Sequence, residues 1–304
     1  MNAGVLILTG PTASGKSALA LRLAERFDAE IVGADSRQIY RGMPIGTAAP
    51  AATDLARVPH HLIGFLDPHE RYSAARFVAD ALAAIDAIHA RGRRAIVAGG
   101  TGFYVRALAG DVMFSSAADA AVRDRLAREA RLHPPQVLAD WLRALAPARA
   151  AALVQSDPYR VVRALEIALG ERSDAQPAEV AAPQNLRTRA IAYRKLYLEA
   201  PPAALEGAIA ARVEGMLAQG LLDEAARVGP EAVAADAVGY REALAYLEGW
   251  STEAELRAQL VRNTRRYAKR QATWSRTEPD LVRIPAAEAY ARSLAEAGGL
   301  PGWA

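Results

Sequence analysis

The sequence contains no cysteine. This excludes disulfide bonds, thiolate metal sites and cysteine nucleophiles, and it is typical of a protein in a reducing compartment. Aromatic residues make up only 6% of the chain, whereas 52% of its residues are hydrophobic. A chain of 304 residues with this composition can bury a substantial core, and its many alanines favour closely packed helices.

Long hydrophobic runs are also missing. The N-terminal "MNAGVLILTGP" has no basic leader and is too short in apolar residues for a signal peptide or a membrane span. We therefore expect a soluble, cytoplasmic protein that does not enter a membrane. The net charge of +3 favours no class of partner, so the distribution of charge along the chain matters more.

Strands and helices alternate over the first hundred residues. We expect buried strands at 5–9, 29–35, 60–67 and 93–100, and helices after the first strand and over 73–91. This alternation predicts an α/β fold, a P-loop NTPase-like parallel sheet flanked by helices.

The pattern changes after Asp111. Residues 122–169 are typical of helices, 170–184 of an exposed linker, and 189–201 of a further strand, with helices from Pro202 onward. We predict an α/β core of residues 1–114 and 188–304 with a helical C-terminal part. A helical insertion domain of residues 115–187 interrupts this core.

The segment "GPTASGKS" lies between the first strand and the first helix. It fits the phosphate-loop pattern G-x-x-x-x-G-K-[ST] in the strand–loop–helix context that the pattern requires. Backbone N–H groups would surround a phosphate, Lys16 would add a charge, and the Ser17 hydroxyl would hold Mg²⁺. The alternative is a glycine-rich turn without a ligand. The predicted phosphate-binding residues are Gly10, Pro11, Thr12, Ala13, Ser14, Gly15, Lys16 and Ser17.

Two further segments follow strands of the predicted sheet, "ADSRQIYRGMPIGTAAP" with Asp35 and "AGGTGFYVRAL" with Thr101. Ligands bind at the carboxyl ends of the strands in open α/β sheets. Asp35 could accept a proton from a nucleophile or hold a metal-bound water, and Thr101 offers a hydroxyl. Each could instead be a helix or turn cap. "RAIVAGG" ends without the acidic residue typical of nucleotide hydrolases, although Asp35 could serve a metal instead.

Residues 251–276 form a predicted helix that begins with a capping box, Thr252 with Glu255. At helical spacing, one stripe is cationic and another apolar. The cationic stripe contains Arg262, Arg266, Lys269 and Arg276, widened by Arg265 and Arg270, and the apolar one contains Leu256, Leu260, Tyr267 and Trp274. No acidic residue lies between Glu255 and Glu278 to pair with these cations. We expect the stripe to bind a nucleic-acid backbone, and the alternative is a solvated charged face.

Taken together, these segments resemble the tRNA dimethylallyltransferase (tRNA isopentenyltransferase) family. The resemblance covers residues 10 to 276 and follows the family's order. It is carried by "GPTASGKS", "DSRQIYRGMPIGTAAP", "PHHLI", "YSAARF", "GGTGFYVRAL", "DPYRVVRALE", "GYREALAYLEG" and "TRRYAKRQATWSR".

This resemblance implies that the loop binds the diphosphate of dimethylallyl diphosphate rather than ATP. The prenyl group would pass to the exocyclic N6 amine of the adenosine 3′-adjacent to the anticodon of tRNA. Asp35 would be the general base, Thr101 would donate to the diphosphate, and Arg212 would bind it. Lys16 and Mg²⁺ at Ser17 would stabilise the leaving charge.

The resemblance and the cationic stripe also indicate how tRNA would bind. Tyr159 and Asp236 stand where the family usually has glutamine. We expect a monomer whose partner is the anticodon stem-loop of tRNA. The predicted tRNA-binding residues are Asp35, Ser36, Arg37, Gln38, Thr101, Arg123, Tyr159, Arg160, Arg163, Arg266, Lys269 and Arg270.

Three other functions fit part of the sequence. An ATP-dependent small-molecule kinase would use the loop and Asp35 but not the basic helix. A non-catalytic RNA-binding P-loop protein would not need Asp35, and a free-nucleotide prenyltransferase would have little need for residues 251–276.

Overall fold

A computed structural model describes residues 3–112, 120–153, 157–170 and 184–303 of the chain. Its contacts divide the chain into two compact units, one of Met1–Val112 with Gln184–Ala304 and one of Met113–Pro183. The bounds of the second unit differ by a few residues from those of the predicted insertion, 115–187.

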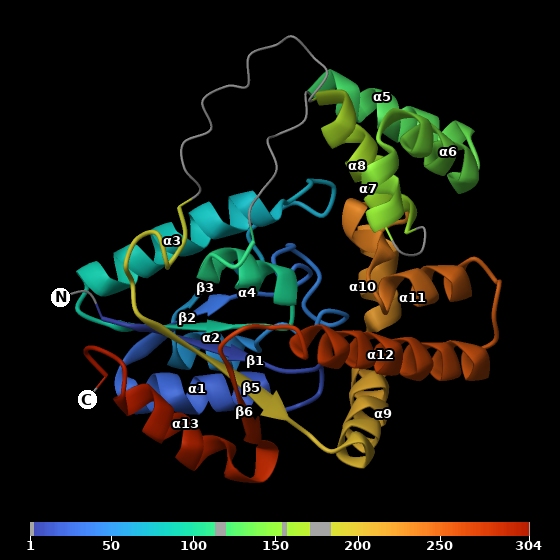
Figure 1. Cartoon of the computed structure of the whole chain (residues 1–304). Helices are drawn as coiled ribbons and strands as arrows, with labels where there is room; N and C mark the ends of the chain where they lie inside the picture. The colour runs from blue at the N-terminus through green and yellow to red at the C-terminus, as the bar shows by residue number, and fades with distance from the viewer. Residues whose placement is uncertain (1–2, 113–119, 154–156, 171–183, 304) are drawn as a thin grey trace. The chain divides into compact units, whose positions relative to one another are not determined.

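The first unit is built on one six-stranded sheet in the order β3-β2-β4-β1-β5-β6 (Figure 1). All neighbouring strands are parallel, and Val5 of β1 lies between Ala95 of β4 and Tyr193 of β5. The predicted parallel α/β sheet is therefore confirmed. Its strands are β1 (Val5–Thr9), β2 (Ala29–Gly33), β3 (His60–His61), β4 (Arg94–Ala98), β5 (Tyr193–Glu199) and β6 (Leu281–Pro285).

Helices cover both faces of this sheet. Helices α1 (Lys16–Phe27) and α13 (Ala289–Gly298) lie on one face, and α3 (Ala74–Ala90) and α4 (Gly102–Ala109) lie on the other (Figure 1). Strand residues such as Leu6 and Ile96 are fully buried in the core between the sheet and the helices α1 and α13. No helix among the described residues is long and apolar enough to cross a bilayer.

The remaining helices of the first unit share a second core with residues that follow β2. Tyr40 and Met43 pack there against Leu221, Tyr240 and Leu256. The capping box predicted at Thr252 is confirmed, because Thr252 Oγ1 accepts the Glu255 N–H and Glu255 accepts the Thr252 N–H. These helices are α9 (Pro202–Ala218), α10 (Leu221–Val228), α11 (Tyr240–Leu247) and α12 (Glu253–Ser275), and the short η1 (Val233–Asp236) joins the same core. The short elements α2 (Ala52–Arg57) and η2 (Ala286–Glu288) lie elsewhere in the unit.

Two strand predictions were wrong in detail. The strand expected at 60–67 is only β3, because the backbone turns at Leu62 and Gly64, whose φ angles are 60° and 58°. Within the region from Pro202 onward, where helices were expected to dominate, β6 pairs in parallel with β5. The five residues of β6 are extended because they pair with β5. The local pattern of apolar residues does not reveal such a pairing.

The described residues of the second unit form helices. Pro135 and Pro147 stand at the starts of α6 and α7, where a missing N–H costs no helix hydrogen bond. Its described elements are α5 (Ala120–Leu132), α6 (Pro135–Leu145), α7 (Pro147–Ala152) and α8 (Pro158–Gly170), packed around a core that includes Leu126, Leu138, Leu142, Val161 and Leu165.

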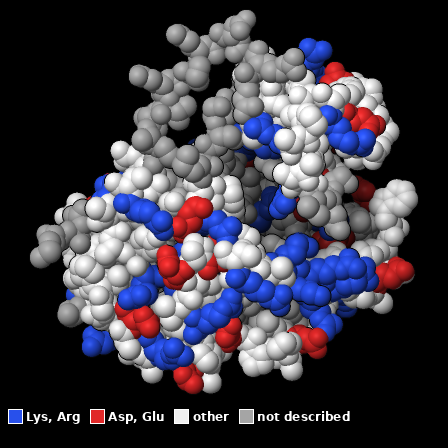
Figure 2. Space-filling model, viewed as in Figure 1, with Lys and Arg blue, Asp and Glu red and all other residues white. Residues whose placement is uncertain are grey.

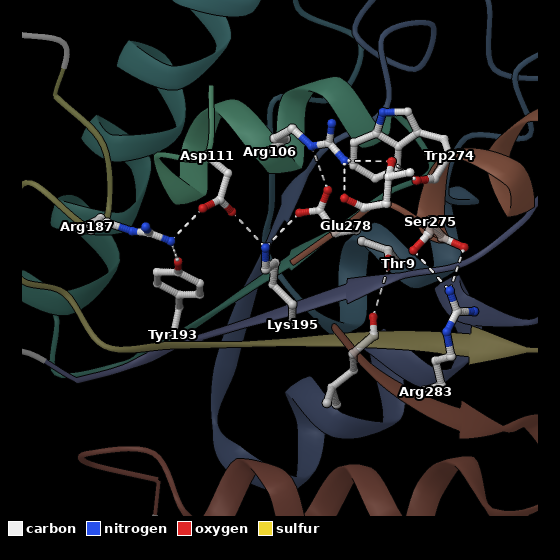
Figure 3. Close-up of polar contacts among 12 residues, drawn as sticks. Thr9, Arg106, Asp111, Arg187, Tyr193, Lys195, Trp274, Ser275, Glu278 and Arg283 are labelled. Atoms are coloured by element: carbon white, nitrogen blue, oxygen red, sulfur yellow. Dashed lines mark hydrogen bonds and ion pairs between the residues drawn. The ribbon is translucent and has the colours of Figure 1, made fainter. Parts of the chain in front are cut away.

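A buried ion network fixes the end of α12 within the first unit (Figure 3). Lys195 Nζ on β5 lies 2.8 Å from Asp111 Oδ2 and 2.7 Å from Glu278 Oε1, and all three side chains are buried. Arg187 binds the same Asp111, and Arg106 binds the same Glu278 at 2.9 Å. The network therefore joins the sheet to Asp111 and Arg187. These two residues lie close to the positions in the sequence where the chain leaves the first unit and returns to it.

Candidate functional site

Three loops of the first unit meet at the carboxyl edge of the sheet, after β1, β2 and β4. The sheet order places β4 between β1 and β2, so their loops are neighbours. A cavity of about 260 Å³ opens there. Of the predicted site residues it brings together Thr12, Lys16, Ser17, Asp35, Ser36, Arg37, Gln38, Arg212 and Arg270.

The loop between β1 and α1 has the backbone of an anion-binding turn. Ala13 and Gly15 have φ angles of 65° and 88°, and Gly15 is the N-cap of α1. Successive residues in such conformations direct N–H groups into one concave space at a helix N-terminus. The buried hydroxyl of Ser14 has no hydrogen-bond partner among the described residues. Gly10 is required beside it, since a Cβ there would lie 2.9 Å from Ser14 Oγ.

Lys16 bends back onto its own loop, where Nζ donates to the Pro11 carbonyl at 3.4 Å. Burial lowers the pKa of Lys16 from 10.5 to about 8, with Asp35 opposing this shift and Arg212 adding to it. An anion bound in the loop would favour the protonated form of Lys16 and raise this pKa again.

Arg212 reaches the phosphate loop from α9. Its Nη1 donates to Thr12 Oγ1 at 2.8 Å. Burial lowers the pKa of Arg212 from its usual value, and the nearby Asp35 opposes that effect. Two cationic side chains far apart in the sequence therefore flank one loop.

Asp35 and Thr101 follow the ends of neighbouring strands, and neither side chain makes a helix-capping hydrogen bond. No helix begins at Asp35, whose Oδ1 accepts the Arg37 N–H at 2.9 Å in a turn. Thr101 precedes α4 but makes no side-chain capping bond. Instead, Thr101 Oγ1 accepts the Ser36 N–H at 2.9 Å. A helix cap was therefore wrong for Asp35, which closes a turn through the Arg37 N–H, whereas Thr101 is the N-cap residue of α4 by position only.

The loops after β2 and β4 are locked together by close backbone contact. A Cβ at Gly99 would lie 2.1 Å from the Ala34 carbonyl oxygen, so only glycine fits there. The Thr101 N–H donates to that carbonyl at 3.2 Å. This contact fixes Thr101 relative to the loop that carries Asp35.

Arg37 and Gln38 are both engaged within the protein. Arg37 Nη1 lies 2.8 Å from Asp236 Oδ1, and both residues line the cavity. Gln38 Nε2 donates to the carbonyls of Thr47 and Ala48 at 3.1 and 2.9 Å. Gln38 thereby holds one wall of the cavity in place.

One face of α12 forms another wall, which the residue pattern did not predict. The pattern places Tyr267 and Trp274 in an apolar seam, but Tyr267 and Gln271 line the cavity. Burial raises the pKa of the Tyr267 hydroxyl, and the nearby Asp35 raises it further. The available signal was Gln271 itself, a polar residue one helical turn after Tyr267 within that seam.

The cationic stripe of α12 forms a band of Lys and Arg on the molecular surface (Figure 2). Arg262, Arg266 and Lys269 are exposed and make no ion pair with any residue in the described part of the chain. The expectation that the whole stripe lacks acidic partners was wrong for Arg265, which pairs with Glu206 of α9. Arg270 lies over the Tyr267 ring at 5.6 Å.

The other predicted tRNA-binding residues belong to the second unit. Arg163 Nη1 lies 2.7 Å from Glu166 Oε2, and Arg123 approaches the same carboxylate at 3.9 Å. Arg160 lies 3.9 Å from Asp157. Tyr159 is 74% exposed at the start of α8.

Metal ligation by protein side chains alone has little support. No group of three His, Cys, Asp or Glu side chains arranged for a metal occurs among the residues that the structure describes. His61, for example, binds Glu30 at 2.6 Å. Ser17 and Asp35 both line the cavity, and their oxygen atoms are of the kind that Mg²⁺ prefers where phosphate oxygens complete its coordination.

Comparison with known proteins decides the family. The family model described as IPP transferase matches residues 38–278. The chain belongs to this family. Curated relatives include a tRNA dimethylallyltransferase of Anaeromyxobacter sp. (strain Fw109-5), 47% identical over 90% of this chain and 92% of its own. Another is tRNA dimethylallyltransferase 1 of Pelobacter propionicus, 43% identical over 95% of each chain.

Solved structures agree with this assignment. A tRNA isopentenylpyrophosphate transferase from Bacillus halodurans is 36% identical, with a TM-score of 0.66 over 93% of this chain and 90% of that one. A eukaryotic dimethylallyltransferase, described as acting on tRNA, is 25% identical with a TM-score of 0.75 over 96% of this chain and 77% of that one.

Proposed function

We propose that this protein transfers the dimethylallyl group of dimethylallyl diphosphate to the exocyclic N6 amine of the adenosine 3′-adjacent to the anticodon. The protein is a transferase that prenylates tRNA. One observation carries the proposal: in a member of this family, a single cavity joins a phosphate loop to a carboxylate, and the helix that forms its wall carries a cationic stripe.

The phosphate loop binds the diphosphate of the donor. Its N–H groups and the N-terminus of α1 supply positive potential, and Lys16 and Arg212 add full charges beside it. The Ser14 hydroxyl, which no other described residue binds, offers one more donor in the loop. These groups favour the transition state, in which negative charge grows on the leaving diphosphate.

Mg²⁺ is the cofactor that this site fits. The Ser17 hydroxyl would hold it, with an Asp35 oxygen within the same cavity. When bound, Mg²⁺ would neutralise charge on the phosphate oxygens.

Asp35 is the general base. The adenosine amine attacks the allylic carbon of the donor, and the carbon–oxygen bond breaks with its electron pair going to diphosphate. The proton lost by the amine passes to the Asp35 carboxylate, which the Arg37 N–H orients at 2.9 Å. Thr101, whose Oγ1 accepts the Ser36 N–H, would donate its hydroxyl to the diphosphate in place of Ser36 Oγ. An aromatic amine is a weak nucleophile, so a positioned base is needed.

The RNA substrate is bound by positive charge. Arg266, Lys269 and Arg270 of α12 contact backbone phosphates of the anticodon stem-loop. Arg123, Arg160 and Arg163 of the second unit provide further contacts, and Tyr159 can stack on an unpaired base. Bases of single-stranded loops can be displaced into such a cavity at a cost of a few kcal/mol.

The test is to incubate the protein with unmodified tRNA, dimethylallyl diphosphate and Mg²⁺, and to analyse the nucleosides by mass spectrometry. We expect N6-(dimethylallyl)adenosine in the anticodon loop and release of diphosphate without ATP. Unmodified tRNA, together with ATP-dependent phosphorylation of a small molecule, would overturn the proposal and favour a kinase. tRNA with guanosine in place of that adenosine is the control.

A further inference from the structure

The side chain of Gln271 connects two of the three loops at the cavity. It lies on α12 and is only 9% exposed. Its Oε1 accepts the Thr12 N–H of the phosphate loop at 2.7 Å. Its Nε2 donates to the Gly100 carbonyl, beside Thr101, at 2.9 Å. One carboxamide therefore uses its donor and its acceptor on different loops.

The loop after β4 is shaped to admit this side chain. A Cβ at Gly100 would lie 2.2 Å from Gln271 Nε2, and a Cβ at Gly102 would lie 2.2 Å from the Trp274 ring. Two glycines therefore let α12 approach the loop at positions one turn apart. The approach fixes the carboxamide against the Gly100 carbonyl.

The two hydrogen bonds of Gln271 complete a connection from the phosphate loop to Asp35, the proposed general base. Thr12 is held by Gln271 through its N–H and by Arg212 through its hydroxyl. On the other side, Gly100 precedes Thr101, whose Oγ1 accepts the Ser36 N–H next to Asp35. The Gln271 carboxamide thus links the phosphate loop to the loops that hold Asp35, the proposed base.

Packing alone does not account for a glutamine here. Leu260, Tyr267 and Trp274 lie on the same side of α12, and Thr264 beside them has only a short polar side chain. A methionine of similar length would fill that space without burying polar atoms. A buried amide is retained at little cost only where both of its ends are hydrogen-bonded, as they are here.

We propose that Gln271 is a positioning residue that sets the distance between the donor diphosphate and Asp35. This rests on the proposed prenyl transfer and assigns a role to a residue that would touch neither the amine nor the allylic carbon. Reacting atoms that are displaced by about 1 Å can lose about 100-fold in rate. Loss of the Gln271 carboxamide should therefore lower kcat more than it lowers the affinity for the substrates.

Gln271→Met tests this role, with Gln259→Met of the same helix as the matched control. We expect kcat for tRNA prenylation to fall by about 10- to 100-fold in Q271M and by less than about 2-fold in Q259M. The affinity for inorganic diphosphate, measured by calorimetry, should change by less than about 3-fold, as should the KM for tRNA. Equal loss of kcat in both variants, or a diphosphate affinity that falls in parallel with kcat, would overturn the proposal.

Gln271→Glu adds a readout that simple loss of packing would not produce. A protonated carboxyl has one acceptor and one donor and can replace the amide, whereas a carboxylate would repel the Gly100 carbonyl. Burial raises the pKa of such a group. The kcat of Q271E relative to wild type should therefore rise at least about 5-fold as the pH falls from about 8.5 to about 6. A constant ratio would contradict the proposal.

Gly100→Ala approaches the same contact from the other side. Its added methyl would displace the carboxamide, so G100A should lower kcat as Q271M does, and the double variant should lose little more than either single one. Additive losses would contradict a shared contact. If this role is wrong, wild-type protein still prenylates tRNA; if wild-type protein transfers no prenyl group, both proposals fail.

Discussion

Arg37 Nη1 and Asp236 Oδ1 form an ion pair of 2.8 Å at the cavity. Their side chains are 34% and 69% exposed, so solvent weakens the pair. Arg37 is one of the residues expected to bind tRNA. An RNA phosphate that approaches Arg37 must compete with this carboxylate.

Asp236→Asn should therefore strengthen tRNA binding. We expect the KM for tRNA to fall by up to about 5-fold, since an exposed pair contributes about 0–1 kcal/mol. Steady-state kinetics at low salt would measure the change, and Asp280→Asn, which removes an exposed charge elsewhere, is the control. An unchanged or higher KM in D236N would mean that the ion pair does not limit access to Arg37.

Asp35→Asn should abolish most activity without loss of donor binding. The asparagine oxygen can still accept the Arg37 N–H, so the turn should persist. Without a carboxylate to take the amine proton, kcat should fall by about 10²- to 10⁴-fold. Single-turnover kinetics and calorimetry with inorganic diphosphate would separate these effects. Near-normal kcat would exclude Asp35 as the base.

Diphosphate binding should weaken above about pH 8, the pKa of Lys16 in the free protein. Below this pH Lys16 is protonated and attracts the anion. As the pH rises through this value, the free protein loses the proton and must take it up again to bind, which costs up to about 10-fold in affinity per pH unit. Calorimetry in buffers of different ionisation enthalpy would detect the uptake. Lys16→Met should bind more weakly and lack this pH dependence.

Arg266→Ala and Lys269→Ala should weaken tRNA binding and reduce its dependence on salt. Each lost phosphate contact lowers the slope of log Kd against log salt by about 0.7 to 0.9. The KM for dimethylallyl diphosphate should not change, and Arg292→Ala on α13 is a control for the loss of an exposed charge. Filter binding at several salt concentrations checks this. A slope equal to that of wild type would remove these residues from the RNA interface.

Lys195→Met should destabilise the first unit. It would leave the buried carboxylates of Asp111 and Glu278 without the ammonium between them, although Arg187 and Arg106 would remain. Breaking a buried ion pair costs about 3–5 kcal/mol. Urea denaturation would measure the loss, with Lys269→Met as the exposed control. The triple variant K195M/D111N/E278Q should recover part of the lost stability.

Much of this protein could be predicted from short segments of its sequence. "GPTASGKS" sets its own loop, because Gly15 and Ala13 adopt left-handed conformations beside a helix start. The capping box at the start of α12 is equally local, because its partners Thr252 and Glu255 lie three residues apart. The alternation of strands and helices up to β4 was also sufficient to predict a parallel sheet. In each case the interacting groups are neighbours in the chain, so spacing and residue type determine them.

Only the tertiary structure decided which distant residues complete the site. Gln271 reaches Thr12, and Arg265 pairs with Glu206 on another helix. The strand at β6 exists because β5 pairs with it. Such contacts depend on how elements pack against one another, and residue spacing carries no information about that packing. The sequence determined the chemistry of each loop, and the fold determined which side chains hold the loops in register.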